Sequence, residues 1–322
     1  MRRIVRSSLT AAVAGLGLLL TACGPTAGVP AKADGNGIAV VASTNVYGDI
    51  VRAIGGDKVK VTAIISRPSQ DPHSYEASAQ DRLAISKAKL VLENGGGYDD
   101  FIHTMADDSG IPHENIINAV EVSGLAPAAE STASAHAESG HAHSHGEFNE
   151  HVWYSLRAMS RLADSVAAKL ESIDSGSAAE FSANAASFKA GLTKIETRLA
   201  TVKAAHGGSQ VAVTEPVPLY LLESAGLVNR TPAEYTAAIE EGTDVPPAVL
   251  RAATALAASS DIRFLAYNEQ TEGPQTEALK NAANAAGKPV LNFSETLPEG
   301  KTYLQWMADN VGNISNSLER KS

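Results

Sequence analysis

Residues 38–65 read IAVVASTNVYGDIVRAIGGDKVKVTAII and contain the clearest signals of secondary structure in the chain. Ile38–Ser43 is a short apolar run of the kind that forms a buried strand. Val46–Gly55 has the apolar spacing of a helix, and Val59–Ile65 is again typical of a strand. A strand, a helix and a strand in this order predict a βαβ unit, and therefore a parallel sheet.

The alternation of strands and helices continues on both sides of a long helical segment. In the first half we expect helices at 80–88 and 99–107 and strands at 90–93 and 115–120. In the second half we expect strands at 210–214, 262–267 and 289–293 and helices at 219–225, 247–258, 275–286 and 303–318. The sequence therefore predicts an α/β fold of two lobes, each with a parallel β-sheet flanked by helices.

The segment between the two halves is helical by its apolar spacing. Helices are predicted at Leu156–Ile173 and Ala178–Ala205. The second is about 28 residues long, so at about 1.5 Å per residue it would span roughly 42 Å, enough to link two lobes. The predicted organisation is a signal peptide, a flexible tether, an N-terminal lobe, a linking helix and a C-terminal lobe, at 1–22, 23–37, 38–176, 177–206 and 207–322.

The first 22 residues are typical of a lipoprotein signal peptide. Three arginines and no acid precede the apolar run Leu9–Leu20, which is too short to cross a membrane comfortably. Leu20-Thr21-Ala22-Cys23 resembles the bacterial lipobox, in which the cysteine becomes the lipidated N-terminus. We therefore expect Cys23 to anchor the chain at the extracytoplasmic face of the cell membrane; the alternative is an ordinary signal peptide with a chance cysteine.

Composition excludes several classes of protein. The chain of 322 residues has a formal net charge of −10, which argues against nucleic acid as the main partner. A single cysteine excludes a disulfide framework and any cysteine-rich zinc module.

The phosphate-binding loop, the dinucleotide motif, the zinc-protease helix and the nucleophile elbow are all missing from the sequence. The absence of these motifs argues against an enzyme without excluding one.

The histidines are concentrated in a segment that is poor in large apolar residues. Residues 123–150 cannot bury enough surface to offset the entropy of ordering them, so we expect a mobile loop. A flexible chain can wrap several imidazoles around one metal ion. The candidate auxiliary metal-capture residues of this loop are His136, His141, His143 and His145. The alternative is a solvated loop without a role, and His103 and His113 are likewise expected to be ordinary surface residues.

The sharpest local signal is Asp71-Pro72-His73-Ser74-Tyr75-Glu76, just beyond the predicted strand Val59–Ile65. Open α/β sheets bind ligands at the carboxyl ends of their strands. A neutral imidazole held in a loop at that position suits a metal such as zinc, so His73 is a candidate metal ligand.

Asp71–Glu76, followed by Asp81 and by Asn94-Gly95-Gly96-Gly97-Tyr98-Asp99, resembles the bacterial zinc/manganese solute-binding lipoproteins of ABC transporters, the cluster A-I, ZnuA-like family. The resemblance covers about Ile38 to Leu318. It implies a receptor that captures a metal ion in the cleft between its lobes and delivers the ion to an ABC transporter permease. It also implies that the long helix limits hinge motion. With this receptor function, we expect a monomer that is not an enzyme.

The resemblance also implies a set of metal ligands, two from each lobe: His73, His151, Glu215 and Glu295. Glu269 is a rival to Glu295, because it follows another predicted strand. Glu150 stands before His151 where the family usually has proline, which loosens the argument for a turn there. The plain alternative for Glu215 and Glu295 is that they are acids at helix starts, where the helix dipole favours them.

The identity of the metal is left open by these residues. The His-rich loop favours Zn²⁺, which we take as the expected metal, whereas two carboxylate ligands favour Mn²⁺. Two other classes of function are compatible with the sequence. One is a metal-stabilised adhesin or host-factor binder, and the other is a secreted zinc hydrolase, for which no general base stands at a motif spacing.

Overall fold

The first parallel sheet and its helices are built by the N-terminal half of the chain. The computed structural model describes residues 37–67, 70, 75–126 and 148–320. The elements in chain order are β1 (Ile38–Thr44), α1 (Asn45–Gly55), β2 (Val59–Ile65), α2 (Ala79–Ile85), β3 (Leu90–Glu93), α3 (Asp100–Asp108), β4 (Ile116–Asn118) and α4 (Ala119–Ser123). The strand order is β2-β1-β3-β4, and all three pairs are parallel. Ile38 pairs with Val59, so the βαβ unit predicted from residues 38–65 is confirmed.

The second sheet repeats this architecture in the C-terminal half. Its elements are β5 (Gln210–Val213), α7 (Leu219–Ser224), β6 (Val228–Asn229), α8 (Ala233–Glu240), α9 (Pro247–Ala257), β7 (Ile262–Tyr267), α10 (Pro274–Ala285) and β8 (Val290–Asn292). The strand order is β6-β5-β7-β8, again with parallel pairs only. The expected α/β fold with two parallel sheets is thus confirmed.

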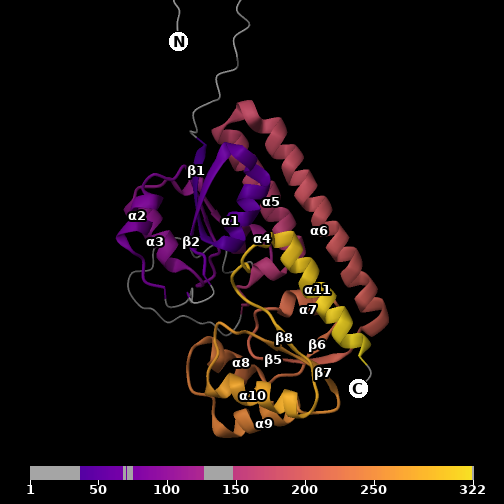
Figure 1. Cartoon of the computed structure of the whole chain (residues 1–322). Coiled ribbons are helices and arrows are strands. Elements are labelled where there is room, and N and C mark those ends of the chain that lie inside the picture. Colours follow the sequence, from indigo (N-terminus) through magenta and orange to yellow (C-terminus); the bar gives the residue numbers. More distant parts are fainter. Residues whose placement is uncertain (1–36, 68–69, 71–74, 127–147, 321–322) are drawn as a thin grey trace, which may run out of the picture. The chain divides into compact units, whose positions relative to one another are not determined.

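Three long helices complete the fold, and the second of them links the two halves of the chain. They are α5 (Leu156–Ile173), α6 (Ala178–His206, 29 residues) and α11 (Tyr303–Glu319). Helix α6 packs against α1 and α5 at one end and against α7 at the other, with α11 alongside (Figure 1). Its buried residues Phe181, Phe188, Leu192 and Leu199 belong to one apolar core that also contains Val40 of the first sheet and Phe264 of the second. The linking helix is therefore part of the core of both halves.

Three elements differ from the sequence expectation. The strand expected at 115–120 ends at Asn118, whose side chain accepts a hydrogen bond from the Glu121 N–H (3.0 Å) and begins the short helix α4. The two-residue strand β6 and the helix α8 carry too little periodicity to be seen in the sequence. The domain boundaries given above stay predictions; Gly37–Ser322 form one compact unit.

None of the helices in the described part of the chain combines the length and the apolar composition needed to cross a membrane.

Candidate metal centre

The structure describes three of the predicted ligands, and all three are buried. His151 is 1% exposed, Glu215 4% and Glu295 2%. The remaining candidates lie outside the described residues: His73, the loop histidines His136, His141, His143 and His145, and the lipidation candidate Cys23. Their roles stay predictions.

The His151 ring is held by Asn149 in one orientation. Asn149 Nδ2 donates to the Pro216 carbonyl (3.0 Å), so Oδ1 of the same amide faces His151. Oδ1 lies 2.7 Å from His151 Nδ1 and also accepts from the His151 backbone N–H (3.1 Å). Because an amide oxygen only accepts, Nδ1 carries the proton. Nε2 then points to Glu240, with 3.6 Å to Oε1, and is the nitrogen suited to bind a metal.

Glu215 and Glu295 lie beyond the carboxyl ends of the second sheet's strands. Glu215 follows β5, and its Oε2 accepts from the Thr271 hydroxyl (2.6 Å). Glu295 follows β8; Asn268 Nδ2 donates to its Oε1 (2.8 Å) and the Tyr98 hydroxyl to its Oε2 (3.0 Å). Tyr98 belongs to the N-terminal half, so Glu295 contacts both halves of the molecule.

Two further carboxylates, Glu150 and Glu240, complete a buried acidic cluster around His151. A ligand atom from each of these three residues lies within 4.8 Å of the others. Burial, Glu150, Glu215 and Glu295 together raise the pKa of Glu240 well above its ordinary value. Burial raises the pKa of Glu150 to about 7. Neither Glu240 oxygen has a hydrogen-bond partner among the described residues. Like charges brought together out of water are costly, and a divalent cation would relieve this repulsion.

The sequence does not identify Glu240 as a member of this cluster. In the sequence, Glu150 stands out only as the residue that lies where the family usually has proline. One signal was available for Glu240. Glu240 and Glu241 stand in sequence at the carboxyl end of α8, where the helix dipole disfavours negative charge. That argument needs α8 to be known first, and the sequence did not predict this helix.

The rival ligands Glu269 and Glu295 differ sharply in environment. Glu269 is exposed, and its backbone N–H donates to Asn292 Oδ1 (3.2 Å). Glu295 is buried among hydrogen-bond donors. Only the second environment suits a carboxylate that is held rigid for an ion.

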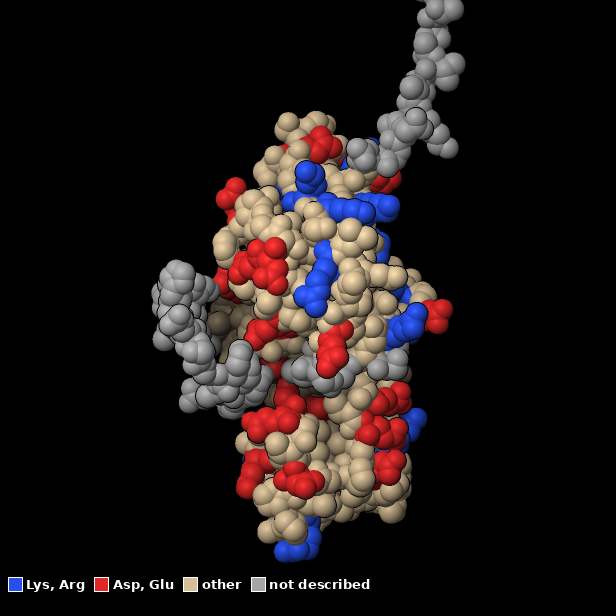
Figure 2. Space-filling view, turned by 90° about the vertical axis from the view of Figure 1, so that its left-hand side faces the viewer, with Lys and Arg blue, Asp and Glu red and all other residues tan. Residues whose placement is uncertain are grey.

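Acidic side chains also dominate part of the outer surface. On the face shown in Figure 2, most of the charged side chains in the lower part are Asp and Glu, whereas most Lys and Arg lie in the upper part. A net charge of −10 raises the concentration of cations near the surface of a protein.

Two parallel sheets linked by a long helix, with buried carboxylates beyond the strand ends and a buried histidine, are the features of a two-lobed metal-binding receptor. Residues 40–317 match the family described as zinc-uptake complex component A, periplasmic, and the chain belongs to this family. The family consists of metal-binding solute-binding proteins, a non-enzymatic class, in agreement with the expectation that the chain is not an enzyme.

Curated relatives match parts of the chain. A putative metal-binding protein of Treponema pallidum is 31% identical over 157 residues, 47% of each chain. The manganese-binding lipoprotein MntA of Bacillus subtilis is 27% identical over 196 residues, 60% of this chain and 58% of MntA. The iron ABC transporter substrate-binding lipoprotein MtsA of Streptococcus pyogenes is 37% identical over 82 residues, 26% of each. The chain thus spans about half the length of the first two of these relatives.

Solved structures share the fold at low sequence identity. The crystal structure of ZnuA has a TM-score of 0.67 at 18% identity and covers 87% of this chain and 99% of that one. A zinc-bound 138-173 deletion mutant of ZnuA has a TM-score of 0.68 at 18% identity, with 89% and 100% covered. The manganese-bound periplasmic metal-binding protein of Candidatus Liberibacter asiaticus has a TM-score of 0.64 at 21% identity, with 87% and 98% covered.

Proposed function

We propose that this protein is a lipid-anchored extracytoplasmic receptor that captures Zn²⁺ and delivers it to the permease of an ABC transporter. The observation that carries the proposal is the buried cluster of His151 with Glu150 and Glu240. The charges of Glu215 and Glu295 lie close enough to this cluster to raise the pKa of Glu240. Family membership supports the same function. Cys23 is the proposed point of lipid attachment.

The proposed ligands are His73, His151, Glu215 and Glu295. They come from both halves of the chain, so a bound ion would be held between the two sheets. An ion held in this way can be released when the halves move apart, whereas a site within one lobe would have to unfold locally. Glu240 faces His151 Nε2 and is proposed as an additional carboxylate that attracts the ion or replaces a ligand.

Zn²⁺ is preferred over Mn²⁺ on general chemical grounds. A given set of nitrogen and oxygen ligands binds Zn²⁺ more tightly than Mn²⁺. The carboxylates of Glu215 and Glu295 nevertheless suit Mn²⁺ well, and the relative MntA is named for manganese. A manganese receptor of the same type is therefore the second candidate, and the His-rich loop is proposed to be an auxiliary zinc-collecting segment.

The test is calorimetry of metal-free protein from which residues 130–146 are deleted, titrated separately with Zn²⁺ and Mn²⁺. We expect one site for Zn²⁺ with a dissociation constant well below micromolar, and weaker binding of Mn²⁺. Binding of both ions no tighter than micromolar would overturn the proposal, and tighter binding of Mn²⁺ would select the second candidate.

Single substitutions assign the ligands in the same titration. His73→Ala, His151→Ala and Glu295→Gln should each weaken Zn²⁺ binding by at least tenfold, because each removes a bond to the ion. The exposed Glu269→Gln is the matched control for Glu295→Gln and should leave the affinity unchanged. In the full-length chain His143→Ala should have little effect; an effect equal to that of His73→Ala would move the main site into the loop.

A further inference from the structure

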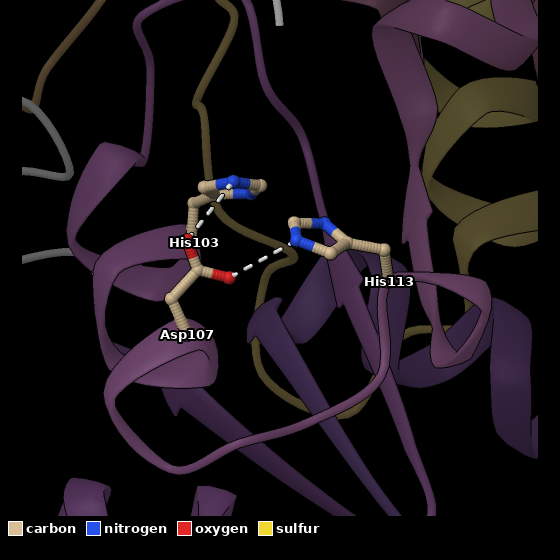
Figure 3. A group of neighbouring side chains, drawn as sticks. All are labelled: His103, Asp107 and His113. Carbon is tan, nitrogen blue, oxygen red and sulfur yellow. Dashed lines mark ion pairs between the residues drawn. The ribbon is translucent and has the colours of Figure 1, made fainter. Parts of the chain in front are cut away.

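A second group of metal-ligand side chains lies on the N-terminal half, formed by residues that the proposed buried centre does not use. His103 and Asp107 belong to α3, and His113 begins the turn after it. His103 Nε2 lies 3.7 Å from Asp107 Oδ2, and His113 Nε2 lies 3.7 Å from Asp107 Oδ1. Figure 3 shows the Asp107 carboxylate between the two imidazole rings. One ligand atom from each residue lies within 4.8 Å of the others.

The backbone brings these three side chains together. His103 and Asp107 are four residues apart on a helix, so they share one face. Helix α3 ends at Asp108, and Gly110 follows its C-cap with a φ of 67°, which is favoured only for glycine. The Gly110 N–H donates to the Asp107 carbonyl (2.9 Å) and the Ile111 N–H to the Ala106 carbonyl (3.0 Å). This hydrogen-bonded turn returns the chain, so that His113 faces the helix it has just left.

A buried carboxylate orients His103. Glu93, at the end of β3, is only 3% exposed, and both of its oxygens lie 3.2 Å from His103 Nδ1. Asn118 Nδ2 donates to Glu93 Oε1 (2.9 Å) and fixes the carboxylate in turn. Since an ionised carboxylate only accepts hydrogen bonds, Nδ1 carries a proton and Nε2 is directed to Asp107. The hydrogen bond to Glu93 and the charge of Asp107 raise the pKa of His103 to about 9, so a metal ion would displace the Nε2 proton at neutral pH. Carboxylate–histidine pairs of this kind hold metal-binding histidines in proteins.

We propose that His103 Nε2, the Asp107 carboxylate and His113 Nε2 bind one divalent transition-metal ion, with Zn²⁺ as the reference ion. Tetrahedral Zn²⁺ with bonds of about 2.0–2.1 Å needs ligand atoms about 3.4 Å apart. The two separations of 3.7 Å run to different oxygens of Asp107, and one ligand atom from each of the three residues lies within 4.8 Å of the others. Side-chain rotations would therefore have to draw the three ligand atoms closer together around an ion. Two imidazoles and a carboxylate leave one position for water or an exogenous ligand. A cavity of about 320 Å³ adjoins the cluster and is lined by His103, His113 and Glu93.

The three side chains are exposed to solvent, and we expect this exposure to lower the affinity of the site for Zn²⁺. The His103, Asp107 and His113 side chains are 46%, 47% and 77% exposed. Ordering His113 on binding costs conformational entropy that a buried ligand has already lost in folding. We therefore expect a micromolar dissociation constant, weaker than that of the buried centre.

The experiment counts zinc equivalents in the full-length, metal-free protein by calorimetry with zinc chloride. His113→Asn and His103→Asn should each remove one micromolar equivalent and leave the tighter binding unchanged. His206→Asn, at the end of α6 and partly exposed like His103, is the matched control and should remove none. Crystals soaked in zinc should show an anomalous peak between the three side chains. An unchanged zinc count in both variants, or soaked crystals without this peak, overturns the proposal.

Zinc binding at the His103, Asp107 and His113 cluster can be distinguished from zinc binding at the buried centre. His151→Ala should weaken the tight equivalent by at least tenfold and leave the micromolar one unchanged, so either site can fail without the other.

Glu93 acts through His103 and is a positioning residue. Glu93→Gln should weaken zinc binding at this site by about tenfold and leave the tight equivalent unchanged. It should also shift the ring ¹⁵N signals of His103 in the metal-free protein, whereas the signals of His206 stay in place. Unchanged zinc binding and unshifted His103 signals would show that Glu93 does not position the ring.

Discussion

Asn149 shows how one side chain can determine what its neighbour does. Its amide donates to Pro216 with one end and accepts from His151 with the other. If the Asn149 amide were reversed, the Pro216 carbonyl would lose its donor. The ring nitrogen that faces the buried carboxylates is thus determined by a hydrogen bond outside the metal centre.

Asp49 carries the first prediction, which concerns pH. Its Oδ2 accepts from the Tyr303 N–H (2.7 Å), and burial raises its pKa above the ordinary value. A raised carboxyl pKa means that folding favours the protonated form, so this group stabilises the fold most at low pH and less as pH rises through its folded pKa. Asp49→Asn resembles the protonated form at every pH. We expect the variant to be more stable than wild type at pH 7 and equal to it below about pH 4.

Denaturant unfolding at several pH values measures this difference. The exposed Asp261→Asn is the control and should follow the wild type throughout. A variant less stable than wild type at pH 7 would contradict the expected sign.

Two glycines of helix α1 differ in whether the surrounding packing requires a residue without a Cβ atom. Gly48 and Gly55 both lie on this helix and both are buried. A Cβ at Gly48 would meet its nearest atoms, Ala63 Cβ and Arg52 Nη1, at 3.4 Å, which is ordinary contact. A Cβ at Gly55 would lie 2.3 Å from Val59 Cγ1 and 3.0 Å from Val59 Cβ. Val59 begins β2 and is stiff at χ1, so it cannot swing away.

The two glycines therefore give opposite predictions for the same substitution. Gly55→Ala should destabilise the protein by about 1–3 kcal/mol, because it overpacks the contact between α1 and β2. Gly48→Ala should be neutral or stabilise by about 0.5–1 kcal/mol, because alanine favours the helix. Free energies of unfolding in urea distinguish the two. Equal effects would show that the α1–β2 contact does not decide between them.

At the scale of the whole molecule, one core holds the two sheets together. Buried residues of the first sheet, of α6 and of the second sheet belong to the same apolar cluster. Polar contacts reinforce it: Asn45 Nδ2 donates to the Leu297 carbonyl (2.8 Å), and the Leu297 N–H donates to Asn45 Oδ1 (2.8 Å). An ion bound by residues from both halves would add to the stability of this joint structure.

Metal binding should therefore raise the melting temperature. Zn²⁺ at about 1,000 times its dissociation constant stabilises the folded state by about 4 kcal/mol, which corresponds to a rise on the order of 10 °C. Differential scanning calorimetry measures the rise, and a chelator should reverse it. His151→Ala should lose most of the rise and His206→Ala should keep it. A full rise in His151→Ala would contradict the proposed role of His151.

Sequence alone was sufficient to predict the helices and strands whose signals are local. The alternation in residues 38–65 predicted β1, α1 and β2, and the apolar spacing after Ala178 predicted α6 with nearly its observed length. Glu215 and Glu295 follow strands that the sequence predicts. Since parallel strands bring their carboxyl ends to one edge of a sheet, the sequence also indicates that the two residues lie at the same edge.

Only the tertiary structure placed Glu240 against His151 and brought Glu93, His103 and His113 together. These residues come from different elements, and their meeting depends on how helices pack on the sheets. The structure also decided that Glu295 is buried and Glu269 exposed. Local periodicity carries no information about such convergence, because the contacts that position these side chains join residues far apart in the chain.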